Sequence, residues 1–395
     1  MRTRLATTLL WALVFSAVTG SAQVSSSQID AIFAALKSND APGAAVLVVH
    51  NGRVAFGRGY GVIDLRTRTK IDAHTNFRLA SFTKQFTAAC IMLLARDGKL
   101  HYDDHLTDFL PEFPEYGRSI TVRNLLNHTS GLPDYEELLT KQYPDTPPEK
   151  VPQILDAGVL KLLEQQTSGE FPAGTKWEYS NSGYAMLAMI VEKVSGKPFG
   201  QFLHERIFVP LKMTSTLAYE KGKNEVPHRA YGHTKADETK KDEAKKDEAK
   251  KDDAKKNAAK TGEVWQETDQ SPTSAVLGDG GIYSSLDDLA KWDRALRDHT
   301  LLSAAEMQPA LTPVEPTAGP AKFPDGSTVS YGFGWFLDPY RGHKRMSHGG
   351  STIGFRTTIQ RFPDEALTII ILANRADLNP EDLALKVADL YLPTR

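Results

Sequence analysis

Two short runs near the start of the chain have the composition of β-strands. Ala45–Val49 is a continuous run of apolar residues, and Val54–Tyr60 follows it after the dipeptide Asn51-Gly52. Asn-Gly between two β-rich segments is typical of a tight hairpin, because both residues accept the left-handed backbone that a two-residue turn requires. Ahead of the hairpin, Ile29–Lys37 has apolar residues at helical spacing. The pattern predicts a helix and then an antiparallel hairpin at the start of the fold.

The C-terminal part of the chain repeats these patterns. Phe355–Phe362 and Leu367–Leu372 have strand composition and are separated by Pro363-Asp364, and Pro380–Leu392 returns to helical spacing. Between the two ends, helical spacing dominates in Thr83–Arg96, Val122–Leu126, Ile154–Gln166, Gly183–Val194, Phe199–Ile207 and Leu286–Leu296. We therefore predict an α/β (α+β) fold in which N- and C-terminal segments build one antiparallel sheet flanked by helices, with a mainly helical region inserted between them.

The first 22 residues have the pattern of a secretory signal peptide. Arg2 and Arg4 precede the apolar run Leu5–Val18, and small residues follow at positions 20–22. The apolar run is too short to span a bilayer comfortably as a stable anchor. We expect cleavage after Ala22 and a periplasmic or secreted mature chain without a membrane anchor, with residues 23–395 forming one domain.

One segment differs from the rest in composition. Residues 235–260 repeat the pentad Lys-Lys-Asp-Glu-Ala and hold 10 lysines and 8 acidic residues. No aliphatic side chain larger than alanine occurs there, so the segment has nothing to bury in a core. Pairs such as Asp242 with Lys246 would support a helix at i,i+4 spacing. We expect a solvated insertion, helical or disordered, and keep a tether to an envelope or an anionic partner as the alternative.

Charge and cysteine content exclude several classes of function. The chain of 395 residues has 47 basic and 49 acidic residues, so its formal charge of −2 provides no overall field that would attract nucleic acid. The single cysteine, Cys90, excludes an intramolecular disulfide. The chain also lacks His-Glu-x-x-His and paired-cysteine spacings, which argues against a zinc site. We expect no nucleic-acid partner, no metal and no cofactor, and the sequence indicates no particular oligomeric state.

Ser81-Phe82-Thr83-Lys84 opens the first long helical pattern. Residues three apart on a helix share a face, so the amine of Lys84 can reach the hydroxyl of Ser81. A serine at a helix start also meets the positive end of the backbone dipole, which favours negative charge developing nearby. To accept a proton Lys84 must be neutral, which requires burial or a nearby cation. Ser-x-x-Lys alone is a weak signal, and the alternative is an N-cap serine followed by a surface lysine.

Two further motifs carry groups suited to the same chemistry. Tyr179-Ser180-Asn181 precedes an apolar helical pattern, where Tyr179 could share proton transfer with Lys84 and the amide of Asn181 could hold that lysine. His348-Gly349-Gly350-Ser351 follows a strand-like stretch at Gly342–Met346. Glycines there let a substrate approach the backbone, and the amides of Ser351 and Ser81 could stabilise an oxyanion. The alternatives are an asparagine cap with a packed tyrosine, and a glycine turn between strands.

The order and spacing of the three motifs resemble the active-site motifs of the serine β-lactamase and penicillin-binding protein family, especially its class C β-lactamase and D-alanyl-D-alanine carboxypeptidase branch. Further stretches are similar to landmarks of that family over about residues 30–392. These are Phe77–Ala80, Leu125–Tyr135, Phe171–Gly174 and Gly280–Ser285. From the residues alone, His128–Tyr135 has no assigned role beyond a loop with a helix stop at Gly131 and Pro133.

The resemblance implies roles for individual residues. It makes Ser81 the acylated nucleophile, Lys84 and Tyr179 the general base and acid, and Asn181 a positioning group. The amides of Ser81 and Ser351 would form the oxyanion hole, with His348, Gly349 and Gly350 on the strand that faces the substrate. Many relatives have Lys-Thr-Gly where this chain has His-Gly-Gly. A mostly neutral histidine does not replace a permanent cation, so recognition of a substrate carboxylate is in question.

Three functions follow. The first is an exported serine hydrolase that cleaves an ester or amide bond of a small molecule or peptide through an acyl-enzyme on Ser81, namely a β-lactamase-related esterase or peptidase. The second is a D-alanyl-D-alanine carboxypeptidase or class C-like β-lactamase. The third is a non-catalytic penicillin-binding-like module.

Arg356 could supply the missing charge or lie on a solvent face. Gly349-Gly350-Ser351 does not continue as a nucleophile elbow, because Ile353 stands where glycine is needed. His101, His105 and His204 read as surface or capping residues.

Overall fold

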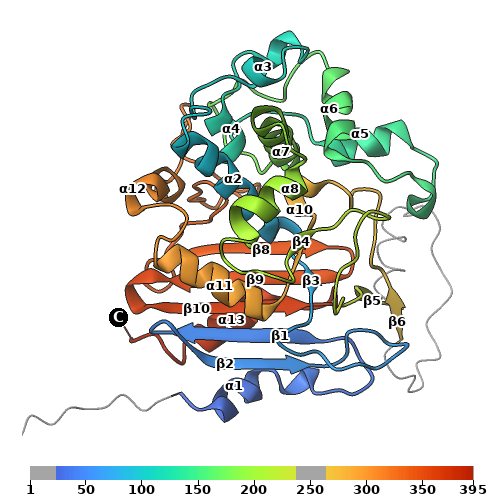
Figure 1. Cartoon of the computed structure of the whole chain (residues 1–395), viewed down its shortest axis with the longest axis vertical. Coiled ribbons are helices and arrows are strands. Elements are labelled where there is room, and N and C mark those ends of the chain that lie inside the picture. Colours follow the sequence, from blue (N-terminus) through green and yellow to red (C-terminus); the bar gives the residue numbers. More distant parts are fainter. Residues whose placement is uncertain (1–23, 237–263, 395) are drawn as a thin grey trace, which may run out of the picture.

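A five-stranded antiparallel sheet forms the base of the molecule (Figure 1). The structure, a computed structural model, describes residues 24–236 and 264–394; the signal peptide and most of the 235–260 insertion lie outside these residues and stay predictions. The strand order is β2-β1-β10-β9-β8. The bounds are β1 (Ala44–His50), β2 (Arg53–Tyr60), β8 (Met346–Thr352), β9 (Phe355–Phe362) and β10 (Leu367–Ala373).

The two ends of the chain meet at the centre of this sheet. β1 pairs with β10 from Ala44 opposite Ala373 to His50 opposite Leu367. Both strands are runs of apolar residues because both of their faces are covered. Helices α1 (Ser26–Ile32) and α13 (Pro380–Ala388) cover one face, and α11 (Leu286–Arg297) covers the other.

The helical region lies beside the edge of the sheet that β8 forms (Figure 1). Its central helices are α2 (Lys84–Arg96) and α7 (Asn181–Ser195), which pack against each other and are largely buried. Around them lie α3 (Leu106–Phe109), α4 (Val122–Leu126), α5 (Tyr135–Gln142), α6 (Asp156–Glu164), α8 (Phe199–Leu203), α10 (Leu277–Gly280) and α12 (Ala304–Met307).

The described residues also form two small sheets. β3 (Phe77–Arg78), β7 (Ile282–Ser284) and β4 (Leu217–Ala218) form one of them, with β7 in the middle. β5 (His233–Lys235) and β6 (Trp265–Glu267) form the other and flank the lysine-rich insertion. β3 runs directly into the segment that carries Ser81, so this small sheet fixes where that residue lies.

The predicted fold class is confirmed, and several element boundaries differ from the prediction, most clearly at two places. The first helix begins at Ser26, because Ser25 and Gln28 form a capping box, and it gives way to a 3-10 turn at Ala34. In the stretch predicted as a strand at Gly342–Met346, Gly342 lies in a turn and His343 forms only an isolated bridge with Tyr340. β8 begins at Met346 and includes the histidine and glycines themselves. No helix among residues 24–236 and 264–394 is long and apolar enough to cross a membrane.

Candidate active site

Ser81 lies in a 3-10 turn, Ala80–Thr83, that joins β3 to α2. Leu79, the residue before this turn, is held by β7 and β9. Its amide donates to the carbonyl of Ile282 (2.8 Å), and its carbonyl accepts a hydrogen bond from the hydroxyl of Thr357 (2.8 Å). Ala80 has φ of 50°, a left-handed conformation that is costly for a residue with a side chain. The sequence placed Ser81 at a helix start, and the structure places it in the turn just before the helix.

Lys84 is the first residue of α2 and is completely buried. Its Nζ lies 3.1 Å from Ser81 Oγ, 2.8 Å from Asn181 Oδ1 and 3.1 Å from the carbonyl oxygen of Asp279. A neutral amine in this position keeps its two donors for the amide and carbonyl oxygens and leaves its lone pair for the proton of Ser81. The burial that proton acceptance requires is thus present.

Tyr179 and Asn181 flank the N-cap of α7. Ser180 caps this helix by accepting the amide of Gly183 (3.0 Å), so Asn181 begins the helix and its side chain reaches Lys84. The ring of Tyr179 has its centroid 4.8 Å from Lys84 Nζ. Tyr179, Asn181 and Ser81 line the same cavity. The two motifs, almost a hundred residues apart in sequence, therefore meet around one lysine.

β8 presents the third motif from the edge of the large sheet. Ser347 exchanges both backbone hydrogen bonds with Phe336 (2.8 and 2.9 Å), on the side away from β9. Because these directions alternate along a strand, the amides of Gly349 and Ser351 also point away from β9. A Cβ on Gly350 would lie 2.0 Å from the carbonyl oxygen of Leu79, so only glycine lets β8 approach the segment before Ser81 this closely.

His348 is an uncharged member of the site. It is 2% exposed, and its Nε2 lies 3.1 Å from the hydroxyl of Tyr331, while Nδ1 lies 2.7 Å from the carbonyl oxygen of Gly349. Burial lowers the pKa of His348 to about 3. The residue that replaces the lysine of many relatives therefore brings no positive charge at neutral pH.

The loop from His128 to Tyr135, which sequence reasoning left without a role, supports Tyr179 from behind. His128 is fully buried, its Nδ1 accepts the amide of Ser180 (3.1 Å), and its ring lies 4.4 Å from that of Tyr179. Farther along the loop, the hydroxyl of Tyr135 donates to the buried side-chain carboxyl of Asp279 (2.7 Å). The backbone carbonyl of Asp279 in turn accepts a hydrogen bond from Lys84. The sequence signals were a polar run between two helical patterns and its similarity to a landmark of the family, and neither says what the loop contacts.

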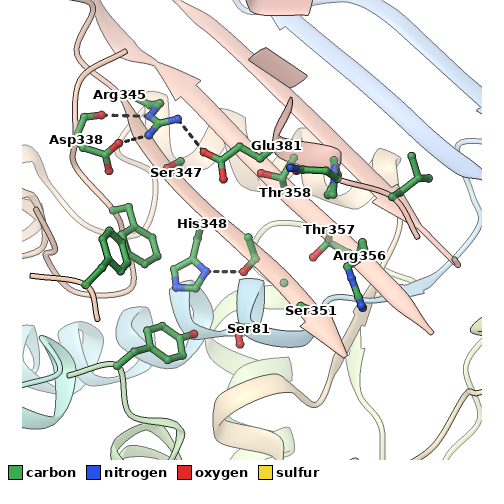
Figure 2. A pocket seen from close by; sticks show the side chains of 18 of the residues that line it. Ser81, Asp338, Arg345, Ser347, His348, Ser351, Arg356, Thr357, Thr358 and Glu381 are labelled. Atoms are coloured by element: carbon green, nitrogen blue, oxygen red, sulfur yellow. Dashed lines mark hydrogen bonds and ion pairs between the residues drawn. The ribbon is translucent and has the colours of Figure 1, made fainter. Parts of the chain in front are cut away.

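A cavity of about 860 Å³ lies over these residues (Figure 2). Its lining includes every predicted site residue except the buried Lys84, which reaches the cavity through Ser81: Ser81, Tyr179, Asn181, His348, Gly349, Gly350 and Ser351. Arg356 is half-buried at its margin and donates to the carbonyl of Phe355 (2.8 Å). His101, His105 and His204 lie on the surface, as expected.

A smaller cavity of about 50 Å³ adjoins Ser81 and Ser351 and is lined by Glu136, which the sequence did not single out. Partial desolvation of its carboxyl group, in a residue that is otherwise exposed, together with the negative charges of Asp279 and Asp134, raises the pKa of Glu136 to about 7. Within the described part of the chain, no group of three or more histidine, cysteine or acidic side chains is arranged to hold a metal ion.

Comparison with known proteins gives consistent results. A family model described as Beta-lactamase matches residues 29–392. Penicillin-binding protein 4* of Bacillus subtilis (strain 168) is 31% identical over 356 residues, which cover 88% of this chain and 71% of that protein. The D-aminopeptidase of Brucella abortus (strain S19) is 28% identical over 352 residues, covering 89% of this chain and 60% of that protein. The solved D-amino acid amidase from Ochrobactrum anthropi SV3 superposes with a TM-score of 0.72 at 23% identity, covering 92% of this chain and 97% of that one.

Proposed function

This chain belongs to the beta-lactamase family, and we propose that it is a serine hydrolase that cleaves an ester or amide bond through an acyl-enzyme on Ser81. The observation that carries the proposal is the contact of Lys84 Nζ with Ser81 Oγ (3.1 Å) at the floor of a large cavity. A nucleophile within hydrogen-bond reach of a buried base is the arrangement that covalent catalysis requires.

The proposed reaction runs in two halves. Lys84 takes the proton of Ser81, whose oxygen attacks the substrate carbonyl carbon, and the bond to the leaving group then breaks. Tyr179, next to Lys84, passes a proton to the departing oxygen or nitrogen. Water then attacks the acyl-enzyme and gives one proton to the same pair of residues; the bond to Ser81 breaks, the acid leaves, and the proton held by Lys84 returns to Ser81 Oγ. No other reactant is needed.

Charge that develops on the carbonyl oxygen needs donors at the cavity floor. We assign this role to the amides of Ser81 and Ser351, because β8 turns its odd-numbered amides toward its free edge. One such donor is worth roughly 2.7–4 kcal/mol in other enzymes. The close approach of Gly350 to Leu79 supports this pairing, since it brings β8 against the segment that carries Ser81.

The first test removes the nucleophile. Ser81→Ala should abolish hydrolysis of a p-nitrophenyl ester and any mass increase of the protein after exposure to a penicillin, as measured by intact-mass spectrometry. Parallel assays with a chromogenic cephalosporin and a D-alanyl-D-alanine peptide examine the β-lactamase and carboxypeptidase alternatives. An unchanged ester rate in Ser81→Ala would overturn the assignment. A wild-type protein that binds these compounds without turnover would support the non-catalytic alternative.

A second candidate, an amidase for substrates with a free amino group, is favoured by Glu136. This acid lies beside Ser81, where a substrate ammonium would pair with it, and D-aminopeptidase is among the relatives. The ratio of kcat/KM for a D-amino acid p-nitroanilide over its N-acetyl derivative should fall about tenfold in Glu136→Gln. Glu137→Gln, at the next position of the same helix but outside the lining of this cavity, serves as the matched control. An equal ratio in both variants would exclude this role.

We also propose that residues 1–22 direct export and are removed. Intact-mass measurement of the protein from its natural host should give a chain that begins at Gln23, and a chain that retains Met1 in the cytoplasmic fraction would contradict this.

A further inference from the structure

A row of uncharged rings forms one wall of the large cavity. Starting beside Lys84, the ring of Tyr179 lies 6.2 Å from that of His348, and His348 lies 5.3 Å from Phe336. Phe336 then stacks on Phe323 at 5.9 Å with an interplanar angle of 24°. Tyr179, His348, Phe336 and Phe323 all line the cavity, so the wall runs without interruption away from the nucleophile.

Phe323 is presented to the cavity by a hairpin that is fixed at its base. Ala321 and Val329 are buried and joined by a hydrogen bond from the Val329 amide (3.0 Å), and the Phe323 amide donates to Ser327 (2.9 Å). The Phe323 ring also meets Trp177 edge to face at 5.5 Å. Even so, Phe323 remains 36% exposed. A large ring held in place at the wall of a cavity offers apolar area that becomes buried only when something occupies the cavity.

The charges of the cavity lie elsewhere. Arg345 forms ion pairs with both Asp338 and Glu381, the latter at 3.0 Å. These three charged side chains therefore pair with one another, and they lie near Ser347 (Figure 2). His348 carries no charge at neutral pH, because burial keeps it unprotonated. An apolar group against the ring wall would therefore displace water without stripping a charged side chain of its partner.

We propose that Phe323 and Phe336 form a binding site for an aromatic leaving group of the substrate. The inference rests on the proposed function, in which Tyr179 protonates the group that leaves the carbonyl carbon as Ser81 is acylated. Since the ring wall starts at Tyr179 and leads away from Ser81, the departing part of the substrate lies along it. Offset and edge-to-face contacts with Phe323 and Phe336 favour a ring over an aliphatic group of the same area.

The test compares two esters of one acid, benzyl butyrate and methyl butyrate, whose leaving alcohols have similar acidity. We expect wild-type kcat/KM to be about tenfold or more higher for the benzyl ester, and this ratio to fall about threefold to tenfold in Phe323→Ala and in Phe336→Leu. Val54→Ala, at an exposed apolar side chain on β2, is the matched control and should keep the ratio. A ratio that is the same in all four proteins would overturn the proposal.

A binding measurement separates this proposal from the hydrolase proposal. Saturation-transfer NMR of benzyl butyrate with Ser81→Ala should show contact through the phenyl protons, and adding Phe323→Ala should remove it. If wild type hydrolyses neither ester but this phenyl contact is present, the aromatic site stands and the hydrolase proposal fails for esters. If the contact is unaffected by Phe323→Ala, the aromatic site is wrong even where hydrolysis by Ser81 is intact.

Discussion

Burial of Lys84 makes its replacement unusually informative. Guanidinium does not release its proton near neutral pH, so Lys84→Arg should lower kcat/KM for ester hydrolysis by about three orders of magnitude. Because the lysine has no exposed surface, we also expect about 1–3 kcal/mol of destabilisation from overpacking. Lys84→Met, of similar volume but without a base, should be equally inactive. Turnover near the wild-type rate in either folded variant would place the base elsewhere.

His348 should make the protein less stable in acid. Above pH 6.5 the residue is neutral in both folded and unfolded chains. Between pH 6.5 and about 3 only the unfolded chain takes up a proton, so unfolding is favoured as pH falls. Relative to His348→Gln, wild type should lose about 1.4 kcal/mol of unfolding free energy per pH unit in this window. Urea denaturation at pH 7, 6, 5 and 4 measures the difference, and parallel curves for both proteins would contradict the lowered pKa.

In the proposed mechanism His128 acts through Tyr179, so we expect it to be a positioning residue. Its φ of 63° is left-handed, and its Nδ1 is the acceptor that fixes Ser180, so asparagine can replace it better than leucine can. We expect His128→Leu to lower kcat about tenfold or more with little change in KM, and His128→Asn to recover part of the loss. Equal effects of the two substitutions on kcat, or an effect on Tm alone, would show that His128 serves only the packing.

Among the elements, β8 has a position, Gly350, that leaves no room for a side chain. A Cβ on Gly350 would meet the carbonyl of Leu79 at 2.0 Å and the hydroxyl of Thr357 at 2.3 Å, whereas one on Gly349 meets nothing closer than 3.6 Å. Gly350→Ala should therefore cost about 1–3 kcal/mol of stability and reduce hydrolysis at least a hundredfold by moving β8 from Ser81. Gly349→Ala is the control for stability in thermal unfolding. Equal Tm values would mean that the two segments separate without cost.

The elements with short-range signals could be predicted from the sequence. The hairpin of β1 and β2 follows from Asn51-Gly52, whose φ values of 50° and 74° are those that its turn needs. Ser81, Lys84, Tyr179 and the β8 motif were predicted because the spacing of their motifs resembles a known family. The contacts of His128 and Asp279 could not be predicted, since they join side chains to the backbone of distant segments, and no local pattern encodes which segment that is.

At the scale of the whole molecule, the charged insertion is attached where two strands pair. Lys235 at the end of β5 lies opposite Trp265 at the start of β6, so the chain leaves and returns at neighbouring positions. Deleting Lys240–Lys256 should therefore leave the flanking pair intact, with Tm within about 2 °C of wild type and an unaltered ester rate. Activity and differential scanning calorimetry check this. A large fall in either would show that the segment packs against the body.

The pairing of β1 with β10 also governs when activity can first arise. A ribosome delivers β1 and β2 early, yet their central partner is completed only at Ala373, after more than nine-tenths of the chain has been made. Until then the hairpin has an open edge and Ser81 lacks the opposing strand β8. In the proposed mechanism a nascent or prematurely terminated polypeptide therefore lacks a complete site, and the last strands to be synthesised complete both the sheet and the site.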